Sequence, residues 1–194
     1  MTNFFFTADQ HFGHAGILRH QSETRPFNSV EEMDEAMIER WNRVVGKGDV
    51  VRVLGDFSFY SPEKTREILK RLNGQKSLIR GNHDASSDRP ATRKCWSTIK
   101  DYDRVKVPRT DFPSVRQPIV LSHYAMRSWH GSFRGAWMLH GHSHGTLTDY
   151  GGLICDVGVD CWDLAPVSMK QLEEFMTDRE MLPDHAYTTE ETNP

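Results

Sequence analysis

The chain of 194 residues has a net charge of −3, with 37% hydrophobic and 26% charged residues. These values are ordinary for a globular protein of one domain, and they exclude the global positive field of a non-specific nucleic-acid or membrane-surface binder. The three cysteines form no CxxC pair, which disfavours a disulfide framework or a zinc ribbon and fits a reducing cytoplasm. No stretch approaches the roughly 18 apolar residues of a membrane span, so we expect a cytoplasmic protein without a membrane partner.

The first half of the chain alternates short apolar runs with amphipathic helical patterns. Residues 4–7 form an apolar run that is too short for a helix and suits a buried strand. Residues 30–45 place apolar side chains at helical spacing after the cap candidates Asn28 and Ser29. The other elements predicted here are a strand at 49–56 that ends in Gly-Asp, a helix at 61–74 that begins with Ser-Pro and ends in glycine, and a strand in 75–84 that runs into Gly-Asn-His-Asp.

The second half consists mainly of strand-like runs. The segment from residue 85 to 118 is polar and contains several prolines, with one possible strand at 103–107. Three apolar runs follow at 118–123, 136–144 and 152–160, and a last amphipathic helix is predicted at 168–181. This pattern predicts an α/β core with a mixed sheet and helices outside. We expect one domain over residues 1–182 and a polar, mobile tail at 183–194.

Five of the apolar runs end in side chains that bind metals or transfer protons. The carboxyl ends of strands in an α/β sheet border a common crevice, so we expect these side chains to converge. A spacing of two residues in extended backbone sends both side chains to the same side of the strand. Glycine before a ligand permits close approach of the loops. The five groups are Asp9 with His11, Gly55–Asp56, Gly81–Asp84, Ser122–His123 and His140–His144.

In this order, the motifs D-x-H, G-D, G-N-H-D, H and G-H-x-H resemble those of the calcineurin-like metallophosphoesterases. The resemblance extends from residue 4 to about residue 160. It implies a four-layer αββα sandwich of mixed sheets flanked by helices, with a two-metal site at the strand ends. One ion would be held by Asp9, His11, Asp56 and His144, and the other by Asp56, Asn82, His123 and His142. His83 would be the acid near the leaving group, and Asp84 would orient it.

The chemistry of these residue types agrees with that implication. Mixed nitrogen and oxygen ligands suit divalent transition metals, so we expect two such ions, manganese first, with iron, zinc or nickel as alternatives. Such a pair can clamp the attacking and leaving oxygens of a displacement and acidify the attacking water. Two aspartates and one hydroxide leave the pair cationic, which attracts a phosphoryl oxygen. The predicted protein is therefore a phosphoric ester hydrolase that attacks a phosphodiester or phosphomonoester with a metal-bound hydroxide.

Four residues near these motifs are candidates for substrate contact. His14 either faces the substrate phosphate or braces its own loop, and Arg127 could bind phosphate. Tyr60 and Trp129 could stack on a nucleobase, although packing within the protein is the favoured alternative for both aromatics. The expected partner is a phosphate ester, with a nucleotide as one candidate. Two other functions stay open: a nuclease that uses the same site on DNA or RNA, and a metal-poor interaction scaffold on the same fold, which the complete ligand set disfavours.

Overall fold

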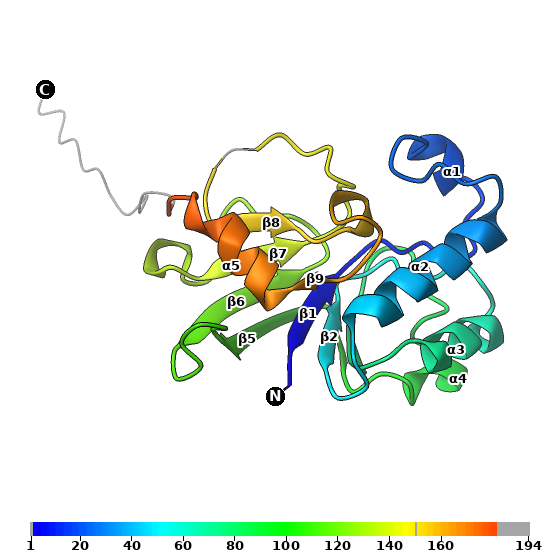
Figure 1. The fold of residues 1–194 in the computed structure, drawn as a ribbon, viewed down its shortest axis with the longest axis horizontal. Helices are drawn as coiled ribbons and strands as arrows, with labels where there is room; N and C mark the ends of the chain where they lie inside the picture. The colour runs from blue at the N-terminus through cyan, green and yellow to red at the C-terminus, as the bar shows by residue number, and fades with distance from the viewer. Residues whose placement is uncertain (1, 150, 182–194) are drawn as a thin grey trace, which may run out of the picture.

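Two β-sheets form the centre of the molecule in the computed structural model, which describes residues 2–149 and 151–181 (Figure 1). The first sheet has the strand order β4-β3-β2-β1-β9, and the second has the order β5-β6-β7-β8. The strands of the first sheet are β1 (Phe4–Thr7), β2 (Val50–Val53), β3 (Gln75–Ile79), β4 (Ile99–Lys100) and β9 (Val167–Ser168). Those of the second are β5 (Tyr102–Pro108), β6 (Arg116–Ser122), β7 (Trp137–His140) and β8 (Ile154–Asp156).

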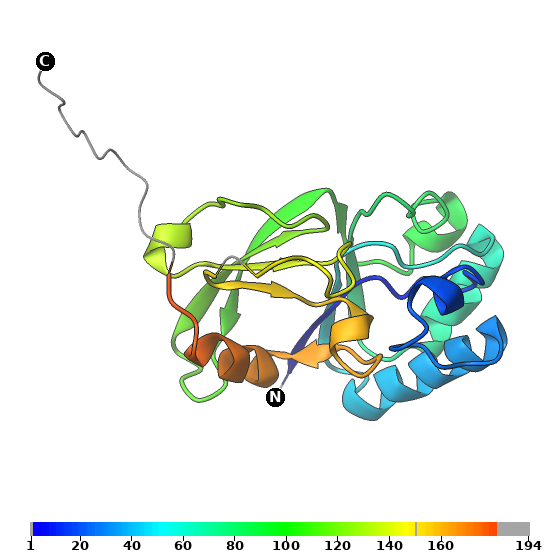
Figure 2. The same ribbon diagram turned by 90° about the horizontal axis from the view of Figure 1, so that it is seen from above.

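The helices flank these sheets. Figures 1 and 2 show α1 to α4 gathered at one end of the molecule, beyond the first sheet, while α5 lies apart from them and beside β9. The α-helices are α1 (Ile17–His20), α2 (Val30–Val44), α3 (Pro62–Arg71), α4 (Pro90–Arg93) and α5 (Met169–Thr177). The described residues also form two short 3₁₀ turns, η1 (Ser132–Arg134) and η2 (Val159–Cys161).

Both sheets are mixed. In the first, β1 runs parallel to β2, with Phe4 opposite Val50, and antiparallel to β9. In the second, β5 runs antiparallel to β6, whereas β6, β7 and β8 are parallel. The predicted α/β sandwich of mixed sheets flanked by helices is therefore confirmed.

Side chains of β1 point alternately to the two faces of the first sheet, and each face has an apolar core. Phe5 faces α2 and packs in a cluster with Met33 and Trp41. Phe6 points the other way, into the layer between the sheets, where it joins Leu139 of β7 and residues of α5. Successive side chains of a strand leave opposite faces of the sheet, so one short apolar run fills two cores and must be buried on both faces.

The helix boundaries follow the predicted cap residues. The Ser29 hydroxyl accepts a hydrogen bond from the backbone N–H of Glu32 at the start of α2, and Ser61 accepts one from Lys64 at the start of α3. Such caps satisfy backbone donors that the first helical turn leaves free. Three elements differ from the prediction. The helix α5 ends at Thr177 instead of residue 181, and the run at 152–160 holds a strand of only three residues followed by η2. The segment 85–118 contains α4 as well as strands.

Two further expectations concern the ends and the surroundings of the chain. The predicted tail at 183–194 lies outside the described residues. Within the described part of the chain, no helix has the length and apolarity needed to cross a bilayer.

Candidate metal centre

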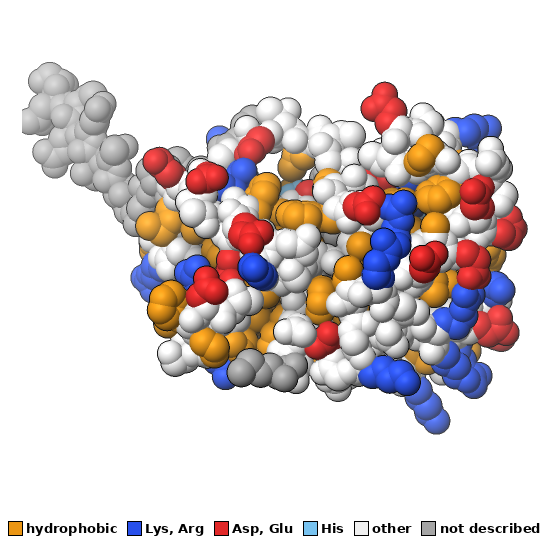
Figure 3. Space-filling model, viewed as in Figure 1, with side chains coloured by type: hydrophobic (Ala, Val, Ile, Leu, Met, Phe, Trp, Pro, Cys, Tyr) orange, Lys and Arg blue, Asp and Glu red, His pale blue; other side chains and the backbone are white. Residues whose placement is uncertain are grey.

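Backbone hydrogen bonds join the loop after β1 to the loop after β2, and the loop after β6 to the loop after β7. The Asp9 N–H donates to the carbonyl of Gly55 at 2.9 Å, and the His11 N–H donates to that of Asp56 at 3.0 Å. On the other sheet, the Gly141 N–H donates to the carbonyl of His123 at 3.0 Å. Between the two sheets, the backbone N–H of His142 donates to Oδ2 of Asp9 at 2.8 Å, so strand ends of both sheets meet at one place. In Figure 3 a small pale-blue patch of histidine is visible, recessed among other side chains near the upper edge of this face.

The backbone of this place is strained. Seven non-glycine residues in the described part of the chain have positive φ, and five of them are predicted metal ligands. Left-handed backbone is costly for a residue with a Cβ atom and persists where the surrounding structure enforces it, often at functional sites. The five are Asp9 (φ 60°), His11 (φ 53°), Asp56 (φ 54°), His142 (φ 68°) and His144 (φ 48°).

Two glycines permit the close approach that their motifs predict. A Cβ atom at Gly81 would lie 2.3 Å from Oδ1 of Asp56, and one at Gly141 would lie 2.7 Å from Oδ2 of Asp9. Both distances are shorter than a carbon can approach an oxygen. Any side chain at either position would therefore displace a carboxylate of the site.

The predicted ligands gather in two groups of side chains. One comprises Asp9, His11 and His144, and the other comprises Asp56, His123 and His142; within each group, one ligand atom per residue lies within 4.8 Å of the others. Asn82 belongs beside the second group, because its Oδ1 lies 3.1 Å from Nε2 of His123. All seven predicted ligands thus lie together.

Asp56 stands between the two groups. Its Oδ2 lies 3.6 Å from Nε2 of His11 and 3.5 Å from Nε2 of His123. One carboxylate oxygen therefore faces an imidazole nitrogen of each group. This is the position that a ligand shared by two cations requires.

The electrostatics of the first group fit a cation. Oδ1 of Asp9 and Nε2 of His11 are buried without a hydrogen-bond partner among the described residues, and unpaired buried polar atoms are costly. Burial raises the pKa of Asp9 to about 7 and lowers the pKa of His11 to about 3. His11 is therefore neutral at physiological pH and offers the free lone pair that a metal needs. A cation would satisfy both atoms.

Two of the predicted ligand histidines are oriented by groups that are not themselves predicted ligands. Nδ1 of His123 lies 2.7 Å from the carbonyl oxygen of Leu54, whereas Nδ1 of His144 lies 2.7 Å from Oδ2 of Asp160. Although burial opposes ionisation of Asp160, hydrogen bonds from Arg25 and His144 keep its pKa well below the usual range. Asp160 is not among the residues predicted from the sequence, although it ends the run at 152–160 as the predicted ligands end theirs.

The position of Asp84 corrects its predicted role. Its buried carboxylate accepts hydrogen bonds from the backbone N–H groups of Asp56, Phe57 and Gly81 at 2.8, 3.0 and 2.7 Å. The imidazole of His83 is exposed and lies against the ring of Phe59, with the ring centres 4.7 Å apart. Asp84 therefore joins the loops after β2 and β3, because buried amides need an acceptor, and it does not orient His83.

The four predicted substrate-contact residues differ in their burial and in what they contact. Trp129 is 7% exposed and donates from Nε1 to the carbonyl of Ala136 at 2.8 Å, so it is a core residue and the stacking hypothesis for it is wrong. The ring of Tyr60 packs under Gly13, where an added Cβ would lie 2.7 Å from it, and is likewise part of the protein's packing. Arg127 is exposed. His14 is half-buried beside the site, with Nδ1 3.3 Å from Nδ1 of His11.

Two other aromatic residues border the ligands. Phe59 is 38% exposed and stacks on His14, with ring centres 4.1 Å apart. Tyr124 is 49% exposed, and its hydroxyl lies 3.2 Å from Oδ1 of Asn82. Both follow predicted ligands closely in the sequence, but their exposure depends on how the loops turn. No local pattern therefore distinguishes them from Tyr60 and Trp129, the two aromatics predicted from the sequence.

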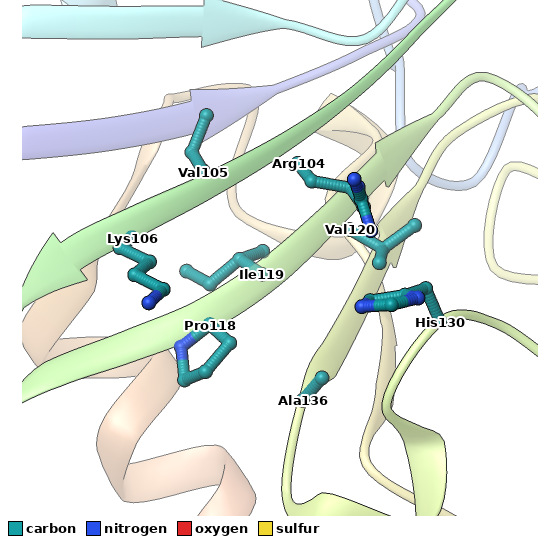
Figure 4. Close-up of a pocket in the computed structure, with 8 residues that line it drawn as sticks. All are labelled: Arg104, Val105, Lys106, Pro118, Ile119, Val120, His130 and Ala136. Atoms are coloured by element: carbon teal, nitrogen blue, oxygen red, sulfur yellow. The ribbon is translucent and has the colours of Figure 1, made fainter.

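A separate cavity lies away from these ligands, on the second sheet. It has a volume of about 290 Å³, and Figure 4 shows side chains of β5 and β6 around it. Its lining consists of Arg104, Val105, Lys106, Pro118, Ile119, Val120, His130 and Ala136. It includes no predicted metal ligand.

Comparison with known proteins identifies relatives of this chain. No family model matches it. It is 32% identical over 177 residues to the uncharacterized protein MJ1445 of Methanocaldococcus jannaschii, covering 87% of this chain and 88% of that protein. It is also 32% identical over 205 residues to the gene 66 protein of Mycobacterium phage D29, covering 93% of this chain and 98% of the phage protein.

Solved structures resemble the fold. The protein of unknown function AQ665 from Aquifex aeolicus has a TM-score of 0.68 at 22% identity, over 90% of this chain and 100% of that one. That likeness concerns the fold alone. A conserved uncharacterized protein from Streptococcus pneumoniae, described as a predicted phosphoesterase, has a TM-score of 0.41 at 16% identity, over 81% of this chain and 71% of that one. A likeness this weak says nothing further about this chain.

Proposed function

The chain belongs to the family of protein MJ1445 and the phage gene 66 protein, and we propose that it is a phosphoesterase that uses two divalent transition-metal ions. The observation that carries this proposal is the position of Asp56. Its Oδ2 lies within 3.6 Å of imidazole nitrogens from both candidate ligand groups. A carboxylate shared between two cations is the usual centre of a two-metal hydrolytic site.

The donor set supports transition metals in both groups. Asp9, His11 and His144 would hold one ion together with Asp56, and Asp56, Asn82, His123 and His142 would hold the other. Mixed imidazole and carboxylate ligands suit manganese, iron, zinc or nickel. When bound, two such ions would polarise a phosphoryl oxygen and acidify a water molecule for attack.

His83 is the proposed proton donor to the leaving group. Its backbone N–H donates to Oδ1 of Asp56 at 2.9 Å, so the residue between the two ligand groups also sets the position of His83. Its imidazole is exposed at the mouth of the site, where a leaving oxygen could reach it. An imidazole can hold a proton near neutral pH and release it to an alkoxide.

The aromatic rings at the mouth suggest how the rest of the ester is held. Phe59 and Tyr124 are partly exposed and flank opposite ligand groups, Phe59 beside His11 and Tyr124 beside His142. Arg25, which is buried beside the site, is bound to Asp160 and turned away from solvent. We therefore favour a small phosphate ester with an apolar or aromatic group, which includes nucleotides.

The test combines metal analysis with hydrolysis. Metal-free protein is loaded in turn with Mn²⁺, Fe²⁺, Zn²⁺ or Ni²⁺ and assayed on bis(4-nitrophenyl) phosphate and 4-nitrophenyl phosphate. We expect Asp56→Asn to lower both the bound metal and kcat/KM, whereas Asp101→Asn, which alters an exposed aspartate paired with Arg80, should match wild type. The proposal would be refuted if wild-type protein hydrolysed neither ester with any of the four metals. It would also be refuted if Asp56→Asn kept the wild-type metal content and kcat/KM.

A further inference from the structure

Directly behind His144 lies a completely buried ion pair. Nε of Arg25 donates to Oδ1 of Asp160 at 2.8 Å, and Nη2 donates to Oδ2 at 2.7 Å. The side chains of both residues have no exposure to solvent. Two parallel bonds between a guanidinium and a carboxylate fix the orientation of both groups.

Asp160 in turn fixes the imidazole of His144. Oδ2 of Asp160 lies 2.7 Å from Nδ1 of His144. An ionised carboxylate can only accept hydrogen bonds, so Nδ1 of His144 must carry the proton. This leaves Nε2 of His144, with its lone pair, for the side of the ring that faces Asp9 and His11.

The same arginine also holds the loop that carries Asp9 and His11. Nη2 of Arg25 donates to the backbone carbonyl of Asp9 at 2.7 Å, and Nη1 donates to that of Gln10 at 2.8 Å. Asp9 and His11 both have positive φ, so their loop needs such restraint. One guanidinium thus holds the loop of Asp9 and His11 through the carbonyls of Asp9 and Gln10, and it reaches His144 through Asp160.

The second ligand group has a different arrangement. Nδ1 of His123 is paired with a neutral carbonyl, that of Leu54. Stability alone does not account for the pair behind His144, because buried ion pairs often stabilise a fold no better than apolar side chains of the same size. A role in ordering the first ligand group does account for it.

We propose that Arg25 and Asp160 are positioning residues that set the metal affinity of the group Asp9, His11 and His144. This inference rests on the proposed metal site, although not on the ester that the protein hydrolyses. Carboxylates that orient metal-binding histidines typically change metal affinity about 10–100-fold when they are replaced.

The test uses a charge-balanced double variant. Arg25→Gln with Asp160→Asn removes both charges together, so neither is left unpaired in the interior. The matched control is Arg40→Gln with Asp163→Asn, an ion pair in which Asp163 is 85% exposed. Metal-free proteins are titrated with Mn²⁺ by calorimetry, and their folding is checked by thermal unfolding without metal. We expect one ion to bind about 10–100-fold more weakly in the double variant, while the control matches wild type.

A measurement without any variant covers the case in which the double variant does not fold. In zinc-loaded wild-type protein, ¹⁵N–¹H correlation of the histidine side chains should show the proton of His144 on Nδ1. A proton on Nε2 would overturn the proposal, as would a folded double variant that binds both ions like wild type. Wild-type protein that binds no ion would overturn both this proposal and the proposed function. If the double variant bound metal more weakly, and wild-type protein bound metal but hydrolysed no ester, the positioning role of Arg25 and Asp160 would be supported. Only the proposed hydrolytic activity would then be refuted.

Discussion

Replacing Asp84 by asparagine tests whether this carboxylate acts on the backbone or on His83. Oδ2 accepts the N–H groups of Asp56 and Gly81, and Oδ1 accepts that of Phe57. An asparagine keeps one acceptor oxygen and places an NH₂ group opposite at least one buried N–H. An orphaned donor costs about 1–3 kcal/mol, and each of the two remaining bonds loses about 1 kcal/mol when the acceptor becomes neutral. We therefore expect the free energy of unfolding to fall by about 3–5 kcal/mol.

The assay is urea unfolding of metal-free protein, followed by circular dichroism. The control is Asp101→Asn, because Asp101 is 82% exposed and pairs with Arg80 at the surface; such pairs contribute about 0–1 kcal/mol. If Asp84→Asn unfolded at the wild-type urea concentration and slowed only esters with poor leaving groups, the backbone role would be refuted. The residue would then act through His83 after all.

Two further predictions concern His83 and a buried acid near the site. His83→Ala should slow the hydrolysis of alkyl or nucleoside esters about 10²–10⁴-fold more than that of nitrophenyl esters, because a general acid matters most for a basic leaving oxygen. If the slope of log(kcat/KM) against leaving-group pKa were unchanged at wild-type metal content, His83 would not be the acid. Burial raises the pKa of Asp34 from 3.8 to about 6, so the folded state binds this proton more tightly than the unfolded state does, and the charged form is disfavoured at neutral pH. Asp34→Asn should therefore raise the free energy of unfolding at pH 7.5 by at most about 3 kcal/mol. This gain in stability should fade as the pH drops from 6 to 4. Urea unfolding measures the gain, and an equal gain at pH 7.5 and pH 4 would contradict this reasoning.

The sequence by itself determined the features that depend on neighbouring residues. The run at 4–7 had to be a strand, since three successive phenylalanines followed by a β-branched threonine are too short a segment for a helix. The Ser-Pro pair at 61–62 marked the start of α3, because serine can cap the free N–H groups and proline suits the first turn. Glycines next to ligand residues indicated crowded loops, and Gly81 and Gly141 do lie against carboxylates of the site.

Tertiary structure alone decided which side chains meet. Arg25 and Asp160 are 135 positions apart, and no local pattern relates two residues so distant. Asp84 follows His83 directly, yet its carboxylate turns inward to backbone amides of two other segments. Trp129 and Phe59 are both aromatic residues in loops after ligands, but one is buried and the other borders the site. Hydrophobic pattern and backbone propensity act over a few residues, whereas burial and hydrogen-bond partners arise only when distant segments pack together.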